Sequence, residues 1–298
     1  MTTQILTKKV KIMQFVDPKN DLAFKKIFAD ETKKEILISL LNAILDFKGE
    51  DIIVDLNIIN PYQAPKIPEL KETILDIRAK DKSGTEFIVE MQKKDLGDFA
   101  KRSLYYTSKA YVSQLNRKGD YSKLNKVYFI GIVDFTMFES DDYISRHLIL
   151  NKQTLKQDLK DFEFTFIELD KFDKDLKDLG TVLDKWIYFI KNATNLDMIP
   201  KEYESIEEFK EAFTIATQYN WNKKELEVYD YMRIKAWDEI NALKTAERKG
   251  EARGMEKGME KGMEKEKISI AKNLLDVLDD ATISIKTGLD IQTIADMR

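Results

Sequence analysis

Residues 72–92, ETILDIRAKDKSGTEFIVEMQ, decide the fold of this chain because they predict a β-hairpin with a defined register. The turn is expected at 82–84 (Lys-Ser-Gly), since glycine suits the left-handed position of a three-residue loop. With that loop Leu75 faces Met91 and Ile77 faces Val89, so that one face of the hairpin is apolar. A two-residue loop would shift the register by one residue and mix the two faces. The pattern therefore favours the three-residue loop.

The other face of this hairpin carries the residues that suggest chemistry. Asp76 is expected opposite Glu90, with β-carbons about 5 Å apart. Gln92 shares their face because side chains two residues apart in a strand point the same way. Two carboxylates this close repel unless a cation or a proton lies between them. The hairpin thus predicts a site for a divalent cation that activates water beside a phosphate, and the alternative is an ordinary acidic pair at a sheet end.

The composition limits the cofactors that the chain can use. There is no cysteine, and His147 is the single histidine, which excludes thiolate sites, disulfides and His-rich zinc sites. Carboxylate ligands favour hard cations, so we expect Mg²⁺ or another divalent cation such as Mn²⁺ or Ca²⁺. No glycine-rich phosphate loop follows a predicted strand, so no nucleotide cofactor is expected.

The charge balance and hydropathy limit partners and location. The chain has 49 basic and 53 acidic side chains, a net charge of −4 and a pI near 5.5. Proteins that coat DNA are usually basic, so nucleic-acid contact here requires local patches. The N-terminus lacks the apolar run of a signal peptide, and no stretch approaches the roughly 18 apolar residues of a membrane span. We expect a cytoplasmic protein without membrane contact.

The remaining pattern predicts a large mixed core followed by helices. Hydrophobic residues make up 43% of the 298 residues, enough for one large core with an appended module. Besides the hairpin, the pattern predicts helices, strands and one loop, in chain order: helices over 20–46, a strand over 52–59, a loop over 62–70, a helix over 98–116, and strands over 126–135, 147–151 and 162–169. This order favours a mixed α/β sandwich over a doubly wound sheet.

We expect three parts along the chain: a core over 1–175, a helical extension over 176–249 and a tail over 250–298. Glycines recur every four residues at the start of the tail, with Met-Glu-Lys between the last three: Gly250, Gly254, Gly258 and Gly262. On a helix they form a stripe that another backbone can approach, although each costs about 1 kcal/mol in helix propensity. We interpret this stretch as a helical linker or a self-association element.

The end of the tail, residues 270–298, contains two short amphipathic pieces on either side of Gly288. Asp290 suits the N-cap of the second piece. The arrangement resembles a helix-turn-helix, but it contains few basic residues. We therefore favour a plain helical cap.

Four stretches carry a wider resemblance: NDLAFKKIF (20–28), ILDIRAKDKSGTEFIVEMQ (74–92), RSLYYTSKAYVSQL (102–115) and the Gly-Met-Glu-Lys tract. Together they resemble the Rpn family of recombination-promoting nucleases, also described as PD-(D/E)XK nuclease family transposases. The resemblance covers essentially the whole chain and is strongest over 17–135. It implies an α/β, restriction-endonuclease-like core with a mixed sheet and a helical C-terminal region.

The resemblance also implies roles for individual residues. Asp76 and Glu90 would be metal ligands, and Gln92 would stand where most relatives of the superfamily have a lysine. Glutamine orients water by hydrogen bonding but brings no charge; Lys93 is a cation but is expected to point to the opposite face. Asp21 is the candidate for an additional acidic ligand from the first helix, and its alternative role is a helix N-cap.

The predicted helix 98–116 offers a surface for nucleic acid. Arg102, Tyr106 and Lys109 share one helix face, where arginine suits a phosphate and tyrosine a base or a phosphate. Gln114 falls within the resembled family's YxxQL motif and is expected to border the site. The alternative is a solvated basic edge above a core stripe, made of Phe99, Leu104, Tyr111 and Leu115.

These features predict a divalent-metal-dependent endonuclease, a hydrolase of DNA phosphodiester bonds, and the resemblance implies a setting in recombination or transposition. Asp76 and Glu90 would hold the metal, and Gln92 would orient water. Two alternatives remain: a non-catalytic DNA-binding or interaction protein that keeps the nuclease fold, and a nuclease that acts on RNA. The glutamine at position 92 and the acidic pI support the first of these.

Overall fold

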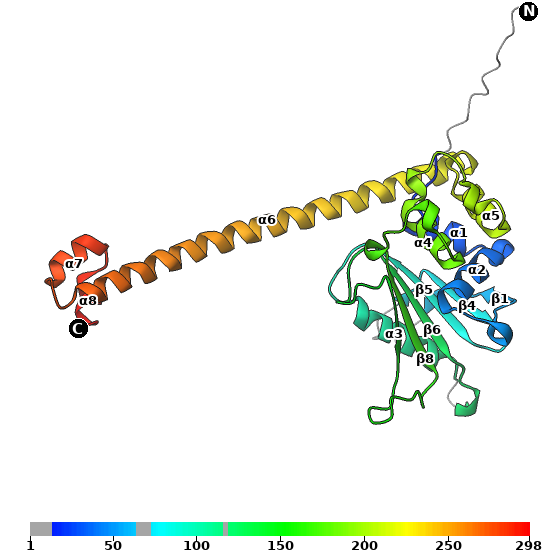
Figure 1. Ribbon diagram of the computed structural model, residues 1–298, viewed down its shortest axis with the longest axis horizontal. Helices are drawn as coiled ribbons and strands as arrows, with labels where there is room; N and C mark the ends of the chain where they lie inside the picture. Colours follow the sequence, from blue (N-terminus) through cyan, green and yellow to red (C-terminus); the bar gives the residue numbers. More distant parts are fainter. Residues whose placement is uncertain (1–13, 64–72, 116–118) are drawn as a thin grey trace, which may run out of the picture. The chain divides into compact units, whose positions relative to one another are not determined.

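The computed structural model describes residues 14–63, 73–115 and 119–298, and the chain divides into two compact units, Met1–Asp230 and Tyr231–Arg298. The first unit contains the sheet and most of the helices, and the second is wholly helical where described (Figure 1). Within the described residues, no helix combines the length and the apolar character that a membrane span requires.

A mixed six-stranded sheet, in the order β1-β4-β5-β6-β8-β7, forms the centre of the first unit. Its strands are β1 (Leu56–Ile58), β4 (Ile77–Asp81), β5 (Glu86–Gln92), β6 (Val127–Val133), β7 (Ile144–Leu148) and β8 (Phe162–Glu168). Strands β5, β6 and β8 run parallel, whereas the other neighbours pair antiparallel. Every residue of β6 is buried, as the continuous apolar run predicts for a central strand.

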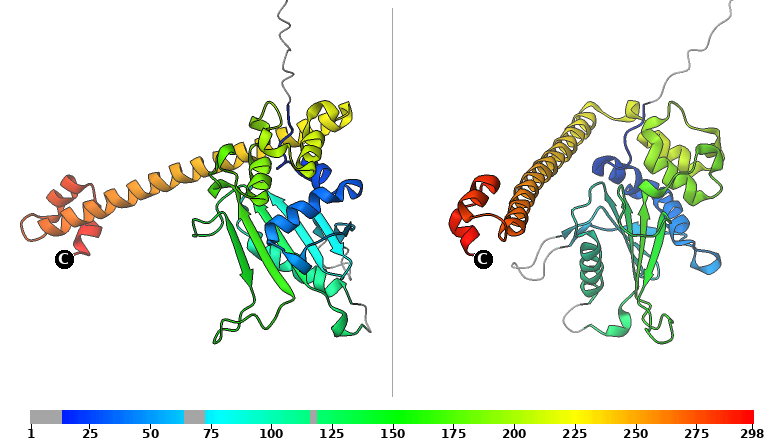
Figure 2. Two further views of the ribbon diagram at one scale, coloured as in Figure 1. Left: turned by 45° about the vertical axis from the view of Figure 1, so that its right-hand side comes forward. Right: turned by 60° about the vertical axis from the view of Figure 1, so that its left-hand side comes forward.

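Helices cover both faces of this sheet, which confirms the expected mixed α/β sandwich (Figure 2). The helices of the first unit are α1 (Asp21–Phe28), α2 (Lys34–Leu45), α3 (Phe99–Ser113), α4 (Val182–Asn192) and α5 (Glu207–Ala216). Four of them share a core with Ile77 and Val89 of the hairpin, whereas α3 packs on the opposite face over Ile88 and Phe129. The hairpin therefore lies between two helical layers.

Side-chain caps explain where the helices of the larger layer begin. Oδ1 of Asn20 accepts hydrogen bonds from the N–H groups of Leu22 (3.0 Å) and Ala23 (3.4 Å) at the start of α1. The alternative role of Asp21 as the N-cap is therefore wrong, because Asn20 is the N-cap of α1. At α4, Thr181 and Asp184 form a capping box.

Two predicted strands differ from those observed. The strand expected over 52–59 is reduced to β1, because the side chain of Asn42 bonds both backbone groups of Ile53 and replaces a strand neighbour. The strand expected over 147–151 begins earlier and ends at Leu148, since Asn151 enters a turn whose carbonyl accepts from the N–H of Leu155 at 2.8 Å.

Three of the sequence predictions concern segments that lie partly outside the described residues. Of the loop expected over 62–70, only β2 (Tyr62–Gln63) is described; it pairs with β3 (Thr73–Ile74), and the remainder lies outside the described residues. The predicted end of the helix at Asn116 also lies outside them. Likewise Glu72, the first residue of the predicted hairpin, is not among them.

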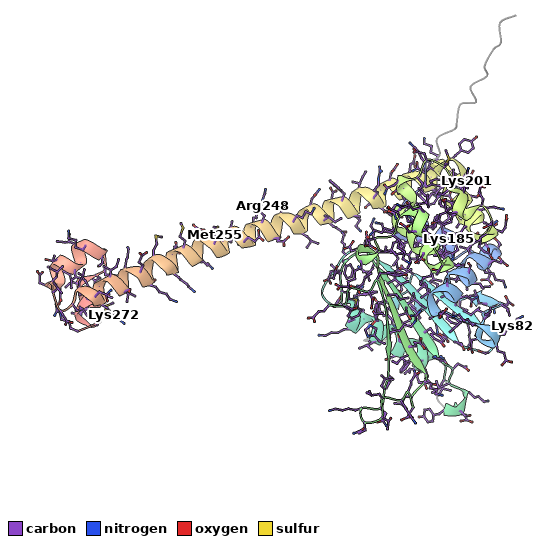
Figure 3. The ribbon with its side chains drawn as sticks, viewed as in Figure 1. Lys82, Lys185, Lys201, Arg248, Met255 and Lys272 are labelled. Atoms are coloured by element: carbon purple, nitrogen blue, oxygen red, sulfur yellow. The ribbon has the colours of Figure 1, made fainter. Side chains whose placement is uncertain are left out.

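One long helix, α6 (Lys223–Leu274), begins in the first unit and continues through the repeated glycines. Side chains such as Arg248 and Met255 extend outward from it (Figure 3), and Met255 is 79% exposed. Apart from the chain neighbours and the helix's own backbone, no described atom lies within 4 Å of a Cβ built on any of the four glycines.

The end of the second unit is a small three-helix core. α7 (Asp280–Thr287) and α8 (Ile291–Ala295) are separated by Gly288 in a left-handed conformation (φ 69°). They pack against the end of α6 through Ala271, Ile283 and Ile294. As predicted, Asp290 caps the last helix, its side chain accepting from the N–H of Gln292.

Candidate active site

The hairpin register agrees with the sequence prediction. Ile77 pairs with Val89 and Ala79 with Phe87, and the N–H of Asp81 donates to the carbonyl of Thr85 at 3.1 Å. Gly84 has φ of 95°, the left-handed conformation expected in a three-residue loop. This register brings the strand ends that carry the two carboxylates together.

The strand predicted over 72–80 is interrupted at Asp76, which lies in a bend between β3 and β4. In place of ladder bonds, the N–H of Asp76 donates to Oε1 of Glu90 (3.1 Å), and the N–H of Met91 donates to Oδ2 of Asp76 (2.8 Å). Each side chain thus satisfies a backbone group of the opposite strand. The two carboxylates are neighbours, as predicted, through side-chain bonds rather than strand pairing.

The bend at Asp76 also corrects one predicted contact. Leu75 was expected to face Met91, but it belongs to the core beneath α3 together with Ile88. Met91 lies in the core on the other face of the sheet. A bend reverses the side on which the preceding residue points, so period-two alternation fails there.

Lys25 of α1 completes the charged cluster, and sequence reasoning missed it. Its Nζ lies 2.6 Å from Oδ1 of Asp21 and 3.3 Å from Oδ1 of Asp76. The sequence signal for this contact is the i, i+4 spacing of Asp21 and Lys25 beside the apolar positions of the helix. The ion pair brings α1 and the hairpin together, so Asp21 lies at the edge of the site.

Burial makes the two hairpin carboxylates poor anions. It raises the pKa of Asp76 to about 6, against the opposing effects of the Met91 N–H and the Lys25 ammonium. Burial first, and then the Asp76 carboxylate beside it, raises the pKa of Glu90 well above its ordinary value. A cation that replaces the bound protons would therefore stabilise the two carboxylates in their charged form.

Gln92, at the end of β5, and Arg102, on α3, are in contact at the edge of the site next to α3. Nη2 of Arg102 donates to Oε1 of Gln92 at 3.1 Å, and Nε2 of Gln92 donates to the carbonyl of Lys94 at 3.0 Å. Nε of Arg102 also lies 3.0 Å from Oδ1 of Asp98. Arg102 is therefore joined to the predicted site through the side chain of Gln92.

The other predicted residues on α3 lie at increasing distance along the helix. Burial, followed by the nearby Glu90 carboxylate, raises the pKa of Tyr106, which places this tyrosine beside the cluster. One turn further on, Nζ of Lys109 lies 6.0 Å from the ring centroid of Tyr105. Lys93 points to the other face, as predicted, where its Nζ lies 2.8 Å from Oδ2 of Asp17.

Gln114 is not brought to the carboxylates. Its side chain donates to the carbonyl of Asn125 (3.1 Å) and accepts from the N–H of Asn125 (2.7 Å). Asn125 precedes β6 at the end where β6 pairs with Glu86, whereas Glu90 pairs with Gly131. Four residues along a strand correspond to about 13 Å, so Gln114 orders the loop at the far end of the sheet.

The alternative core stripe of α3 is only partly confirmed: Phe99 is buried and Tyr111 packs against the same core, whereas Leu104 does not. The residues that α3 buries are Phe99, Ser103, Thr107 and Ala110. Leu104 is 55% exposed, because the helix turns its small residues toward the sheet. The basic face with Arg102 and Tyr106 borders this buried stripe.

The donor set fits a hard divalent cation. Asp76 and Glu90 offer carboxylate oxygens, whereas the part of the chain that the structure describes holds no group of three or more Asp, Glu, His or Cys side chains that could hold a metal. Mg²⁺ is commonly held by one or two carboxylates and keeps several waters. Two buried carboxylates with raised pKa values provide such a set.

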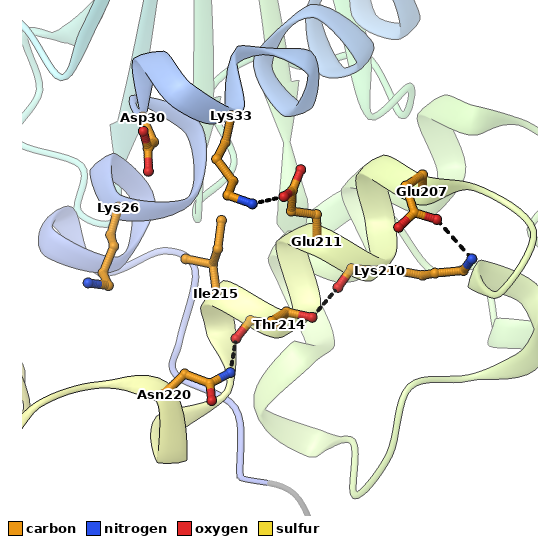
Figure 4. A pocket seen from close by; sticks show the side chains of 9 residues that line it. All are labelled: Lys26, Asp30, Lys33, Glu207, Lys210, Glu211, Thr214, Ile215 and Asn220. Atoms are coloured by element: carbon orange, nitrogen blue, oxygen red, sulfur yellow. Dashed lines mark hydrogen bonds and ion pairs between the residues drawn. The ribbon is translucent and has the colours of Figure 1, made fainter.

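A separate pocket of about 460 Å³ lies between α1 and α5 (Figure 4). The three lysines that line it are each paired with glutamates: Lys26 with Glu225, Lys33 with Glu211, and Lys210 with Glu207. Their charges are therefore largely neutralised within the protein. The pocket does not contain the hairpin carboxylates, so the chemistry is expected elsewhere.

Comparison with known proteins identifies the family of the chain. A family model described as PD-(D/E)XK nuclease family transposase matches residues 18–246. No curated protein and no solved structure matches the chain. The match covers most of the chain, including the hairpin, α1 and α3, and agrees with the mixed sheet and helical layers described above. The chain therefore belongs to the PD-(D/E)XK nuclease family transposases.

Proposed function

We propose that the protein is a divalent-metal-dependent endonuclease that hydrolyses DNA phosphodiester bonds. The observation that supports this most strongly is the hydrogen bond from the N–H of Asp76 to Oε1 of Glu90 at the end of the hairpin, beside the bond from the N–H of Met91 to Oδ2 of Asp76. It holds two buried carboxylates together where their charges repel. A protein keeps such an unfavourable arrangement at sites of function more often than elsewhere.

In this proposal Asp76 and Glu90 hold the cation. When bound, Mg²⁺ supplies an activated water and neutralises charge that develops on the phosphate. Gln92 carries two amide hydrogens, one of which bonds to the carbonyl of Lys94. The second is suited to orienting the attacking water, and Arg102 fixes the orientation of the amide from the oxygen side.

The substrate side of the site is assigned to α3. Arg102 and Tyr106 are half-buried next to the carboxylates, and Lys109 follows on the same helix face. Basic and aromatic side chains in this order suit a phosphate backbone with an adjacent base. We therefore propose that the DNA strand binds along this face. The proposed biological role is recombination or transposition in the cytoplasm.

The test is nicking of supercoiled DNA in Mg²⁺, Mn²⁺ or Ca²⁺ by the wild type and by Asp76→Ala and Glu90→Ala variants. We expect cleavage by the wild type and loss of at least about 100-fold in each variant. Glu163→Gln is a matched control, because Glu163 is a partly buried carboxylate of β8 that pairs with Lys126. Equal nicking by all four proteins would refute the assigned site.

The same assay separates the two alternatives. DNA binding without cleavage in any cation would indicate a non-catalytic protein that retains the nuclease fold. Faster cleavage of RNA than of DNA of the same sequence would indicate a ribonuclease.

A further inference from the structure

We propose that Lys25 supplies the positive charge that this site directs at the scissile phosphate, a charge that Gln92 does not bring. This inference rests on the proposed nuclease function. The geometry behind it is the ammonium group of Lys25, which lies 3.3 Å from Asp76 and 2.6 Å from Asp21. Lys25 comes from α1, so the cation and the carboxylates belong to different layers of the fold.

The position of Lys25 is fixed by the packing of its helix. Ala23, Phe24, Ile27 and Phe28 are fully or almost fully buried in the main core. Asn20 caps the first turn. A short helix held in this way presents Lys25 to the hairpin without the loss of freedom that a mobile lysine would suffer.

Neighbouring cations are engaged in other contacts. Lys93 lies 2.8 Å from Asp17 on the opposite face of its strand. Arg102 bonds to Gln92 and lies 3.0 Å from Asp98. Neither of these contacts involves Asp76, whereas Lys25 lies beside its Oδ1.

Lys25 also remains open to a ligand. Its side chain is 34% exposed, in contrast to 17% for Asp76. A divalent cation on Asp76 and Glu90 would repel the ammonium from Asp76, while Asp21 would retain it at the edge of the site. There it meets an anionic phosphate, and a charge-assisted hydrogen bond strengthens as negative charge develops in the transition state. Asp21 is then the positioning residue for Lys25.

The experiment compares Lys25→Met, Lys25→Arg and Lys26→Met with the wild type. Lys26 is the matched control, since it adjoins Lys25 in the sequence but pairs with Glu225. We expect Lys25→Met to lower kcat about 100-fold, with partial recovery in Lys25→Arg and no change in Lys26→Met. Cation binding, measured by calorimetry with Mn²⁺ alone, should be as tight or tighter in Lys25→Met, because a nearby like charge is removed.

The outcomes separate a catalytic role from a structural one. Wild-type kcat in Lys25→Met would overturn the inference while leaving the nuclease function intact. A parallel loss of kcat, Mn²⁺ affinity and thermal stability in both Lys25 variants would also overturn it, since the lysine would then only support the fold. Absence of cleavage by the wild type refutes the nuclease function, and with it this role of Lys25.

Discussion

The backbone N–H of Asp76 donates to the side chain of Glu90 at 3.1 Å, so one carboxylate of the site receives a hydrogen bond from the residue that carries the other. This relationship makes the site part of the hairpin's own hydrogen bonding. It also keeps two acidic groups in a buried environment that opposes their ionisation.

The first prediction is that Asp76→Asn stabilises the metal-free protein at pH 8. The pKa of Asp76 is raised from 3.8 to about 6, so the folded state binds this proton more tightly than the unfolded state. Its contribution to stability is complete below about pH 4 and is lost as the pH rises to about 6. Asparagine avoids that loss and retains an oxygen for the N–H of Met91.

We expect a gain of about 3 kcal/mol at pH 8 and little gain at pH 4. Thermal unfolding at both pH values measures it, with a rise of about 8 °C at pH 8. Glu163→Gln is the control, since loss of its ion pair with Lys126 should bring no such gain. An Asp76→Asn protein that is less stable at pH 8 than the wild type would contradict the inference that burial destabilises the charged form of Asp76.

The second prediction concerns the pH dependence of cation binding. Asp76, with a pKa of about 6, and Glu90, with a pKa raised further above its usual range, must release protons when a cation binds. At pH 5 a group with a pKa near 6 is only about 10% ionised, so Mn²⁺ affinity should fall at least tenfold between pH 8 and pH 5. Calorimetry in buffers of different ionisation enthalpy detects the released protons, and equal heats in all buffers would count against it.

The third prediction is that Gly84→Ala is more damaging than Gly97→Ala. Both glycines have positive φ, 95° and 76°, so each alanine meets about 1–2 kcal/mol of backbone strain. A Cβ at Gly84 would also lie 2.7 Å from Nδ2 of Asn125, whereas at Gly97 no described atom lies within 4 Å. We expect about 1 kcal/mol more loss of unfolding free energy at Gly84, measured by urea denaturation. Equal losses would show that Asn125 moves aside freely.

The fourth prediction addresses the repeated glycines of α6. Alanine at all four positions should raise the helix content and stability of the second unit, by up to about 1 kcal/mol at each site, because no described atom crowds the added methyl groups. Circular dichroism measures the first effect. Sedimentation measures self-association: weaker association in the alanine variant supports the glycine stripe as a contact between copies, and unchanged association removes it from consideration.

Much of the hairpin was predictable from the sequence because apolar alternation and loop length restrict each other. Ile77, Val89 and Gly84 specify one register, and the structure has that register. The bend at Asp76 was not predictable in this way. Periodicity describes residues whose backbone bonds follow the ladder, and here the side chains of Asp76 and Glu90 replace the ladder bonds.

The contribution of α1 to the site was only partly predictable. Asp21 was singled out through a family resemblance, while Lys25, four residues later, has the spacing of an ordinary surface ion pair on a helix. Its second partner, Asp76, is 51 positions further along the chain. Contacts of this kind depend on how two layers dock, which local sequence patterns do not encode.

The docking of α1 has a consequence for the timing of activity during synthesis. The segment before α1 is held by the end of α5, where the N–H of Val16 donates to the carbonyl of Ala216 at 2.8 Å, and α1 itself contacts α5. A growing chain that has reached only residue 200 already contains both hairpin carboxylates, but it lacks α5, one of the helices against which α1 packs. We therefore expect the complete charged cluster to assemble only after most of the first unit has emerged from the ribosome, so that, on the proposed function, an incomplete chain is a poor nuclease.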